Sequence, residues 1–301
     1  MDRISTFNQQ RQFISQALEV QKRYAAEQTQ QSTSVKALIY DGYGAESRTI
    51  ISLETDLKLA DQYVSNGTLV AARVQGAYSA ASSISDLTTN ARAWLSSLIS
   101  GATDDISGAN VQAQAYLDEV GALLNTKVDG YYVFGGGNTT TAPVDLSTYA
   151  ATDAATVDTS YYKGSDAGAS YEAAPGLDIT YSASATNSGF EKLMRALSLA
   201  AQASENPADL DTVQDAYDLL DQAIDEISVE QSRISGVAQS IDSAMDQNVD
   251  FQLYVESLVD DLKNVDVTEI TAKLSATELQ LESSYSVLKA LQSINLLDYL
   301  R

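Results

Sequence analysis

The stretch Val128–Val144, VDGYYVFGGGNTTTAPV, separates two regions of the chain that differ in sequence pattern. Apolar residues recur at helical spacing before it, whereas clusters of Thr, Ser, Ala, Gly and Tyr follow it. The run Gly135–Gly137 lacks the Lys-Ser/Thr pair of a phosphate-binding loop, and no strand–glycine–helix unit follows it. We therefore expect these glycines to end a helix and to form a hinge, not to bind a nucleotide.

On the C-terminal side, apolar residues repeat in alternating three- and four-residue steps from 213 to 262. Polar side chains interrupt this heptad pattern at Gln231, Asn248 and Gln252. The pattern predicts one helix of about 75 Å, since each residue adds about 1.5 Å. The seam consists of Val213, Tyr217, Leu220, Ile224, Ile227, Ile234, Ala238, Ile241, Met245, Val255, Val259 and Leu262.

On the N-terminal side, a matching seam predicts a second long helix, followed by a further helix around Val111–Val128. The chain has only 3 Pro, so long unbroken helices are possible. The N-terminal seam consists of Ile50, Leu53, Leu57, Ala60, Val64, Ala71, Val74, Tyr78, Ala81, Leu87, Trp94 and Leu98.

The two chain ends carry weaker apolar stripes. The first forty residues offer only Ile4, Phe7, Ile14 and Leu18, a stripe too thin to hold an isolated helix in water. We expect this segment to be poorly ordered until it meets a partner, which is most naturally the last forty residues. Their seam, which follows a predicted break within Leu258–Glu269, consists of Val267, Ile270, Leu274, Thr277, Leu281, Ser284, Leu288 and Leu291.

Between about 135 and 188 the composition favours strands and loops, with strand-like pieces at Thr159–Tyr162 and Leu177–Tyr181. The predicted fold class is therefore mainly α with a small β insert, built from long antiparallel helices and a terminal coiled coil. We expect three parts. Residues 1–42 and 262–301 form the terminal coiled coil, residues 43–134 and 188–261 the helical core, and residues 135–187 a β-rich outer domain.

Composition excludes several functional classes. Lys and Arg total 18 against 41 Asp and Glu, and the resulting net charge of −23 repels nucleic acid. The chain has no Cys and no His, which removes disulfides, thiolate or imidazole metal sites and the usual catalytic proton carrier. No acidic pair has the spacing of a calcium loop, so we expect no metal, no cofactor and no catalytic residues. We also expect no membrane insertion, because no apolar run reaches about 18 residues.

Three stretches carry a family resemblance. Leu124–Gly136, LNTKVDGYYVFGG, and the C-terminal Leu279–Leu300, LQLESSYSVLKALQSINLLDYL, resemble signatures of the flagellin superfamily, particularly of its hook-associated branch. Tyr161–Asp166, YYKGSD, is similar to a stretch in the middle domain of that branch. Asp41–Glu46, DGYGAE, departs from the pattern, because many members carry a Ser-Asp-Asp-Pro type loop there.

The resemblance implies a structural subunit of the bacterial flagellum that joins hook to filament and is not an enzyme. Subunits of the family stack as a tube, with the terminal helices inside and the β domain outside. The implied partners are further copies of this chain, other hook-associated proteins, flagellin, the flagellar export apparatus and an export chaperone. The implied location is extracellular, on the flagellum, after export by the flagellar type III apparatus without a cleaved signal peptide.

The residues that we expect at the interface between subunits belong to the terminal stripes, because terminal heptads without an internal partner can be buried between copies. They are Ile4, Phe7, Ile14, Leu18, Ile270, Leu274, Leu281, Leu288 and Leu291. Gly135, Gly136 and Gly137 are expected to form the hinge to the outer domain.

Three alternatives remain open at this point. A filament flagellin of the same superfamily would show the same heptads. A surface enzyme would need a convergent polar cluster in the β insert. A tip-like protein of a type III secretion system would also use long paired helices.

Overall fold

The computed structural model describes residues 2–101, 106–205 and 207–293. The chain forms two compact units. The terminal unit comprises residues 1–58 and 252–301, and the central unit comprises residues 59–251. Two long helices, α2 (Ser47–Gly101) and α5 (Leu210–Lys263), contribute residues to both units. The described part is mainly helical with two small sheets, which confirms the predicted fold class.

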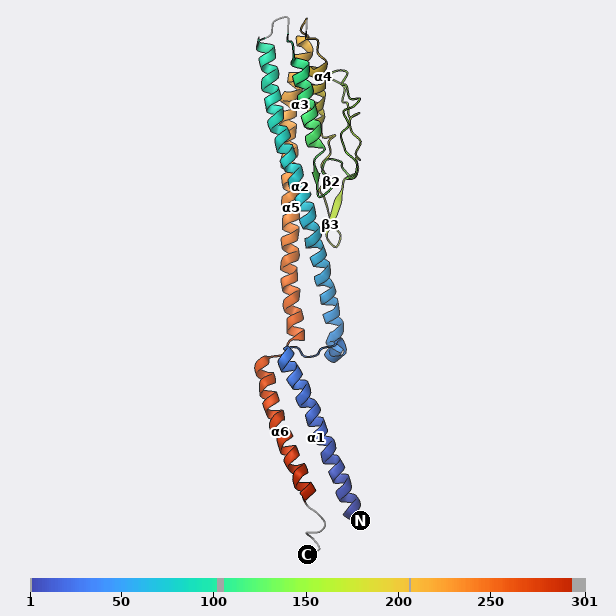
Figure 1. Cartoon of the computed structure of the whole chain (residues 1–301), viewed down its shortest axis with the longest axis vertical. Helices are drawn as coiled ribbons and strands as arrows, with labels where there is room; N and C mark the ends of the chain where they lie inside the picture. Colours follow the sequence, from blue (N-terminus) through green and yellow to red (C-terminus); the bar gives the residue numbers. More distant parts are fainter. Residues whose placement is uncertain (1, 102–105, 206, 294–301) are drawn as a thin grey trace. The chain divides into compact units, whose positions relative to one another are not determined.

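In the terminal unit, α1 (Asp2–Thr33) and α6 (Val267–Ser293) pack side by side as an antiparallel pair (Figure 1). The predicted partnership of the two chain ends is thereby confirmed. The predicted break in the C-terminal seam is also present, since α5 ends at Lys263 and α6 begins at Val267. A 3-10 helix, η1 (Tyr40–Glu46), precedes α2.

In the central unit, α2 and α5 run side by side, and α3 (Ala109–Leu124) packs against α4 (Ser188–Gln202) (Figure 1). The predicted seams of α2 and α5 face the core, apart from Tyr78, which is exposed. The core also takes large side chains from α4 and one, Phe134, from the position directly before the glycine run. Its largest fully buried side chains include Phe134, Phe190, Leu193, Met194, Leu197, Leu220 and Ile227.

A hairpin forms at Lys127–Tyr132, where the sequence pattern was not used to predict one. Strands β1 (Lys127–Val128) and β2 (Tyr131–Tyr132) pair antiparallel around the two-residue turn Asp129–Gly130. Both turn residues have positive φ, 52° and 80°, as a type I′ turn requires. The Asp-Gly pair is a strong hairpin signal and could have been recognised in the sequence.

The second sheet pairs β3 (Ser170–Ala174) with β4 (Leu177–Thr180). It confirms the strand predicted at Leu177–Tyr181. The piece predicted at Thr159–Tyr162 contributes only an isolated bridge between Tyr162 and Val144. A four-residue piece can form few hydrogen bonds to a neighbouring strand, so this region consists mainly of turns and loops.

The glycine run does not end a helix, contrary to the expectation from sequence, because α3 already ends at Leu124. Gly135 forms a backbone bridge with Ser184, and Gly136 forms one with Ser165. A Cβ at Gly135 would overlap the carbonyl oxygen of Asn138, and one at Gly136 that of Ser165. The absence of side chains therefore permits close backbone packing here. The hinge role of Gly135–Gly137 stays a prediction.

Candidate assembly interface

The paired helices of the terminal unit contain most of the residues expected at an interface. Ile270 is buried, and Leu274, Leu281 and Leu288 are half-buried. These four side chains follow one stripe of α6, and α1 is the helix that packs against α6. The side chains of Ile4, Phe7 and Leu291 lie outside the described residues.

The stripe of α1 that is covered within the chain is not that of Ile14 and Leu18, whose place between subunits stays a prediction. Ile14 and Leu18 are 44% and 53% exposed, whereas Ala17 and Val20 are buried. The stripe of Ile14 and Leu18 and the stripe of Ala17 and Val20 run next to each other on α1. So few apolar residues do not define which of the two stripes faces α6. A hydrogen bond of 3.1 Å from Gln31 Nε2 to Thr271 Oγ1 also joins the two helices.

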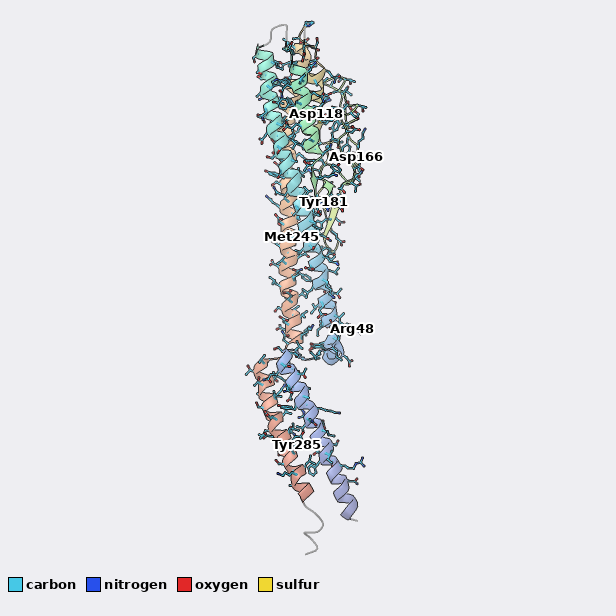
Figure 2. The ribbon with its side chains drawn as sticks, in the orientation of Figure 1. Arg48, Asp118, Asp166, Tyr181, Met245 and Tyr285 are labelled. Carbon is cyan, nitrogen blue, oxygen red and sulfur yellow. The ribbon has the colours of Figure 1, made fainter. Side chains whose placement is uncertain are left out.

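Helix α6 carries a second apolar stripe on its opposite side. Leu279 is 68% exposed and Val287 is 41% exposed. At about 100° per residue, these two side chains point away from the stripe of Leu274 and Leu281. The small residues Ala272, Ala276 and Ser283 lie on the same side and are also exposed. Tyr285, one turn after Leu281 and on the side of the first stripe, is likewise exposed (Figure 2).

We call Ile14, Leu18, Leu279 and Val287 the uncovered apolar residues. Because they are exposed, they add little to the stability of the single chain. Large apolar side chains stabilise a structure only when they are removed from water. A helix with two apolar sides is typical of a helix that packs against more than one neighbour. The uncovered apolar residues are therefore the candidate surface for association with another chain.

The linkers that lead into the helix pair are joined by backbone hydrogen bonds. Lys36 N donates to Lys263 O at 2.7 Å, and Val265 N donates to Ser34 O at 3.0 Å. The Lys36 ammonium donates to the carbonyl oxygens of Leu262, at 2.8 Å, and Asp261, at 3.2 Å. These are carbonyls at the end of α5, which have no partner within the helix. The linkers thus form a defined junction at the base of the helix pair.

A carboxylate completes this junction. Glu54 accepts a hydrogen bond of 2.8 Å from Lys263 Nζ and one of 2.5 Å from the hydroxyl of Tyr40. The bonds from Lys263 and then Tyr40 lower the pKa of Glu54. The same carboxylate raises the pKa of Lys263 and that of Tyr40. Glu54 therefore connects the first linker, through Tyr40, to the end of α5.

In the central unit, the polar interruptions of the α5 seam anchor other segments. Asn248 Nδ2 donates to the carbonyl oxygen of Ala173 in β3 at 2.8 Å, and Gln231 Nε2 donates to that of Ala81 in α2 at 3.0 Å. The sequence marks Asn248 and Gln231 as polar breaks in the seam but does not show their partners. Their position in the apolar seam was a signal for these contacts, because a polar group that is buried in a core needs a hydrogen-bond partner.

A buried ion pair holds the loops of the insert against α4. Arg195 Nη2 lies 3.2 Å from Glu191 Oε2, and both side chains are almost fully buried. Glu191 also accepts a hydrogen bond of 2.9 Å from the backbone N of Asp158. Burial raises the pKa of the nearby Tyr149 hydroxyl. These groups are enclosed and serve packing, so they do not offer an accessible catalytic cluster.

Two other kinds of site are absent from the described ranges. No group of three or more Asp or Glu side chains there could hold a metal ion. No helix in those ranges is both long and apolar enough to cross a membrane.

Comparison with known proteins adds a family for the C-terminal part. Residues 217–300 match the family described as the bacterial flagellin C-terminal helical region. The match includes most of α5 and all of α6. No protein with a curated description matches the sequence.

Solved structures extend the likeness to the fold. A chain from Vibrio parahaemolyticus, provisionally described as a flagellar hook-associated protein, aligns with a TM-score of 0.58 and 18% identity over 72% of this chain and 97% of its own. FlgL of Bacillus cereus aligns at 16% identity over 69% of this chain and 98% of its own, with a TM-score of 0.46. Flagellar hook-associated protein-3 of Legionella pneumophila aligns at 16% identity over 79% and 99%, with a TM-score of 0.27.

The likeness of fold rests on the first of these structures, whose TM-score exceeds 0.5. The family match rests on residues 217–300, which include the stripe and the uncovered apolar residues of α6. Residues 217–300 thus match the C-terminal helical region of bacterial flagellins, and the fold of the chain is similar to that of the Vibrio parahaemolyticus structure.

Proposed function

We propose that the chain is a structural subunit of the bacterial flagellum that joins hook to filament. The observation that carries this proposal is the second apolar stripe of α6, which lies within the residues that match flagellins. An assembly of many copies would bury Leu279 and Val287, whereas a lone subunit leaves them in water. Burial stabilises by about 1.5–3 kcal/mol for each fully covered large apolar side chain.

In this proposal, copies stack as a tube through residues 1–42 and 262–301, with the insert 135–187 on the outside. Packing between copies covers the uncovered apolar residues of α1 and α6. Further hook-associated proteins and flagellin are the neighbours above and below. The role is structural, without catalysis or cofactor.

The proposed location is the flagellum outside the cell. Export proceeds through the flagellar type III apparatus, with an export chaperone to hold the chain. A chaperone is consistent with the exposed Leu18 and Leu279, because exposed apolar side chains promote nonspecific association before assembly.

A filament flagellin is the second candidate. The observation that favours it is the family match itself, which is to the C-terminal region of flagellins. Such a protein would use the same stripes, since packing between helices does not define how many copies are stacked.

Immunogold electron microscopy separates the two candidates. An antibody against Ser147–Ala174, in the outer insert, is applied to intact cells. Label in one spot between hook and filament is the expected result. Label along the whole filament would instead establish the flagellin role.

A further inference from the structure

A groove in the central unit has no role in the function proposed above. It lies between α2 and the β3–β4 hairpin and has a volume of about 500 Å³. Leu59, Tyr63 and Leu69 line it from α2, and Tyr171 and Tyr181 line it from the hairpin side. Tyr181 is labelled in Figure 2. An aromatic and aliphatic lining is typical of protein–protein contact surfaces.

The α2 wall has the spacing of a helix-binding groove. Leu59, Tyr63, Asn66 and Leu69 follow one another at three- and four-residue steps, and Leu59 and Leu69 remain exposed. A helix that lies in such a groove inserts side chains between these positions. The groove therefore suits a helix as its occupant.

Arg73 gives the groove a positive group. Its guanidinium carbon lies 4.2 Å from the centroid of the Tyr131 ring, and Nη1 lies 3.4 Å from the Tyr181 hydroxyl. Among the described residues, Arg73 makes no salt bridge to a carboxylate, and its Nε has no hydrogen-bond partner. Glu172 lies elsewhere on the groove wall. An occupant with an acidic residue at one end and uncharged residues beyond would complement Arg73 without opposing Glu172.

The outer side of α5 has this character. Asp218, Asp225, Val229, Ser232 and Gly236 follow one exposed stripe at three-, four- and seven-residue steps. Val229 is 70% exposed on the side opposite the buried seam of α5. A Cβ at Gly236 would meet no atom within 4 Å, so nothing in the chain itself packs there. Small residues allow a second helix to approach closely.

We propose that the groove between α2 and the hairpin receives the outer stripe of α5 from a second copy of this chain. Val229 enters between Leu59 and Leu69, and Asp225 pairs with Arg73. The contact joins two different surfaces, so each copy can both give and receive it and the contact can repeat around a closed ring or a helical tube. The inference rests on the proposed function, in which copies lie side by side.

Photo-cross-linking identifies the occupant directly. A benzoylphenylalanine replaces Leu69, whose exposed side chain contributes little to the fold, and the variant is expressed in the native flagellated cells. Sheared flagella are irradiated and digested, and cross-linked peptides are identified by mass spectrometry. The expected product is a covalent dimer whose second peptide lies between residues 222 and 243.

The matched control carries the same group at Val111, which is exposed on α3 outside the groove and should not yield that peptide. A cross-link from position 69 to another protein, to another part of the chain, or to nothing would overturn the inference while leaving the proposed function standing. Loss of the protein from sheared flagella, with wild-type chain also absent, would overturn the proposed function and this inference with it.

Discussion

At the scale of single residues, Gly67 shows how α2 and α5 approach each other. A Cβ at this position would lie 2.7 Å from Met245 Cγ on α5 and 2.9 Å from the hydroxyl of Tyr171 in β3. Glycine within a helix costs about 1 kcal/mol relative to alanine. The close packing of Met245 and Tyr171 offsets that cost here.

Gly67→Ala should therefore destabilise the protein by up to about 1 kcal/mol, because the ends of the Met245 and Tyr171 side chains must shift and this cost outweighs the gain in helix propensity. Gly236→Ala, on the open side of α5, is the matched control and should stabilise by up to about 1 kcal/mol. Urea unfolding followed by circular dichroism measures both free energies. Equal stabilisation by the two changes would show that α2 and α5 are not in close contact at Gly67.

Glu54 gives a pH dependence at the same scale. Its pKa in the folded chain lies below that of the unfolded chain, because Lys263 and Tyr40 hydrogen-bond to the carboxylate. The stabilisation is therefore fully present above the unfolded pKa and is lost as pH falls through the folded pKa. Glu54→Gln should lower the stability at pH 7 and reduce its fall between pH 5 and 3.

Glu269→Gln provides the control for this titration. Glu269 pairs with Lys273 at 2.6 Å, but both side chains are more than half exposed, and such pairs contribute little. Thermal unfolding of the terminal unit is compared for the three proteins across this pH range. Identical pH profiles for wild type and Glu54→Gln would contradict the role of the carboxylate in the junction.

At the scale of elements, strong apolar periodicity predicted the helices well. The long seams of α2 and α5 gave the correct core face, and the pairing of α1 with α6 followed from their weaker stripes. On α1, Ala17 and Val20 are buried within the chain whereas Ile14 and Leu18 are exposed, so the place of Ile14 and Leu18 between subunits stays a prediction. Which side of α1 faces α6 depends on the shape of both helices, and the apolar pattern of one helix does not contain that information.

The anchors of the insert could not be derived from periodicity alone. Asn248 was visible as a polar break, but its acceptor, Ala173, is 75 residues away in sequence. The buried pair of Glu191 and Arg195 was equally hidden, since charged residues usually mark a solvent-exposed face. Long-range contacts of this kind depend on the path of the insert, which composition leaves open.

The seam of α6 permits a test at this scale. Leu281→Asp combined with Leu288→Asp should separate α6 from α1, because two carboxylates would replace half-buried leucines. The helices of the central unit should remain. Limited proteolysis should then cleave within 2–33 and 267–293 faster than in the wild-type monomer while a core fragment survives. A cleavage rate unchanged from the wild-type monomer would show that these leucines do not hold the pair.

At the scale of the whole molecule, the proposed assembly predicts a change in protection. Residues 1–40 and 265–301 should be protease-sensitive in the monomer and protected in sheared flagella, since neighbouring copies would cover α1 and α6. Mass spectrometry of timed digests measures both states. Equal protection in both states would count against assembly through the terminal helices.

The central claim is that the uncovered stripe of α6 joins copies of the chain. The most direct measurement is electron microscopy of flagella from cells that carry Leu279→Asp and Val287→Asp, with the purified variant checked by circular dichroism. Because both side chains are exposed in the single chain, the variant should fold like the wild type, yet hook and filament should no longer be joined. Flagella of normal number and length built with this variant would contradict the account.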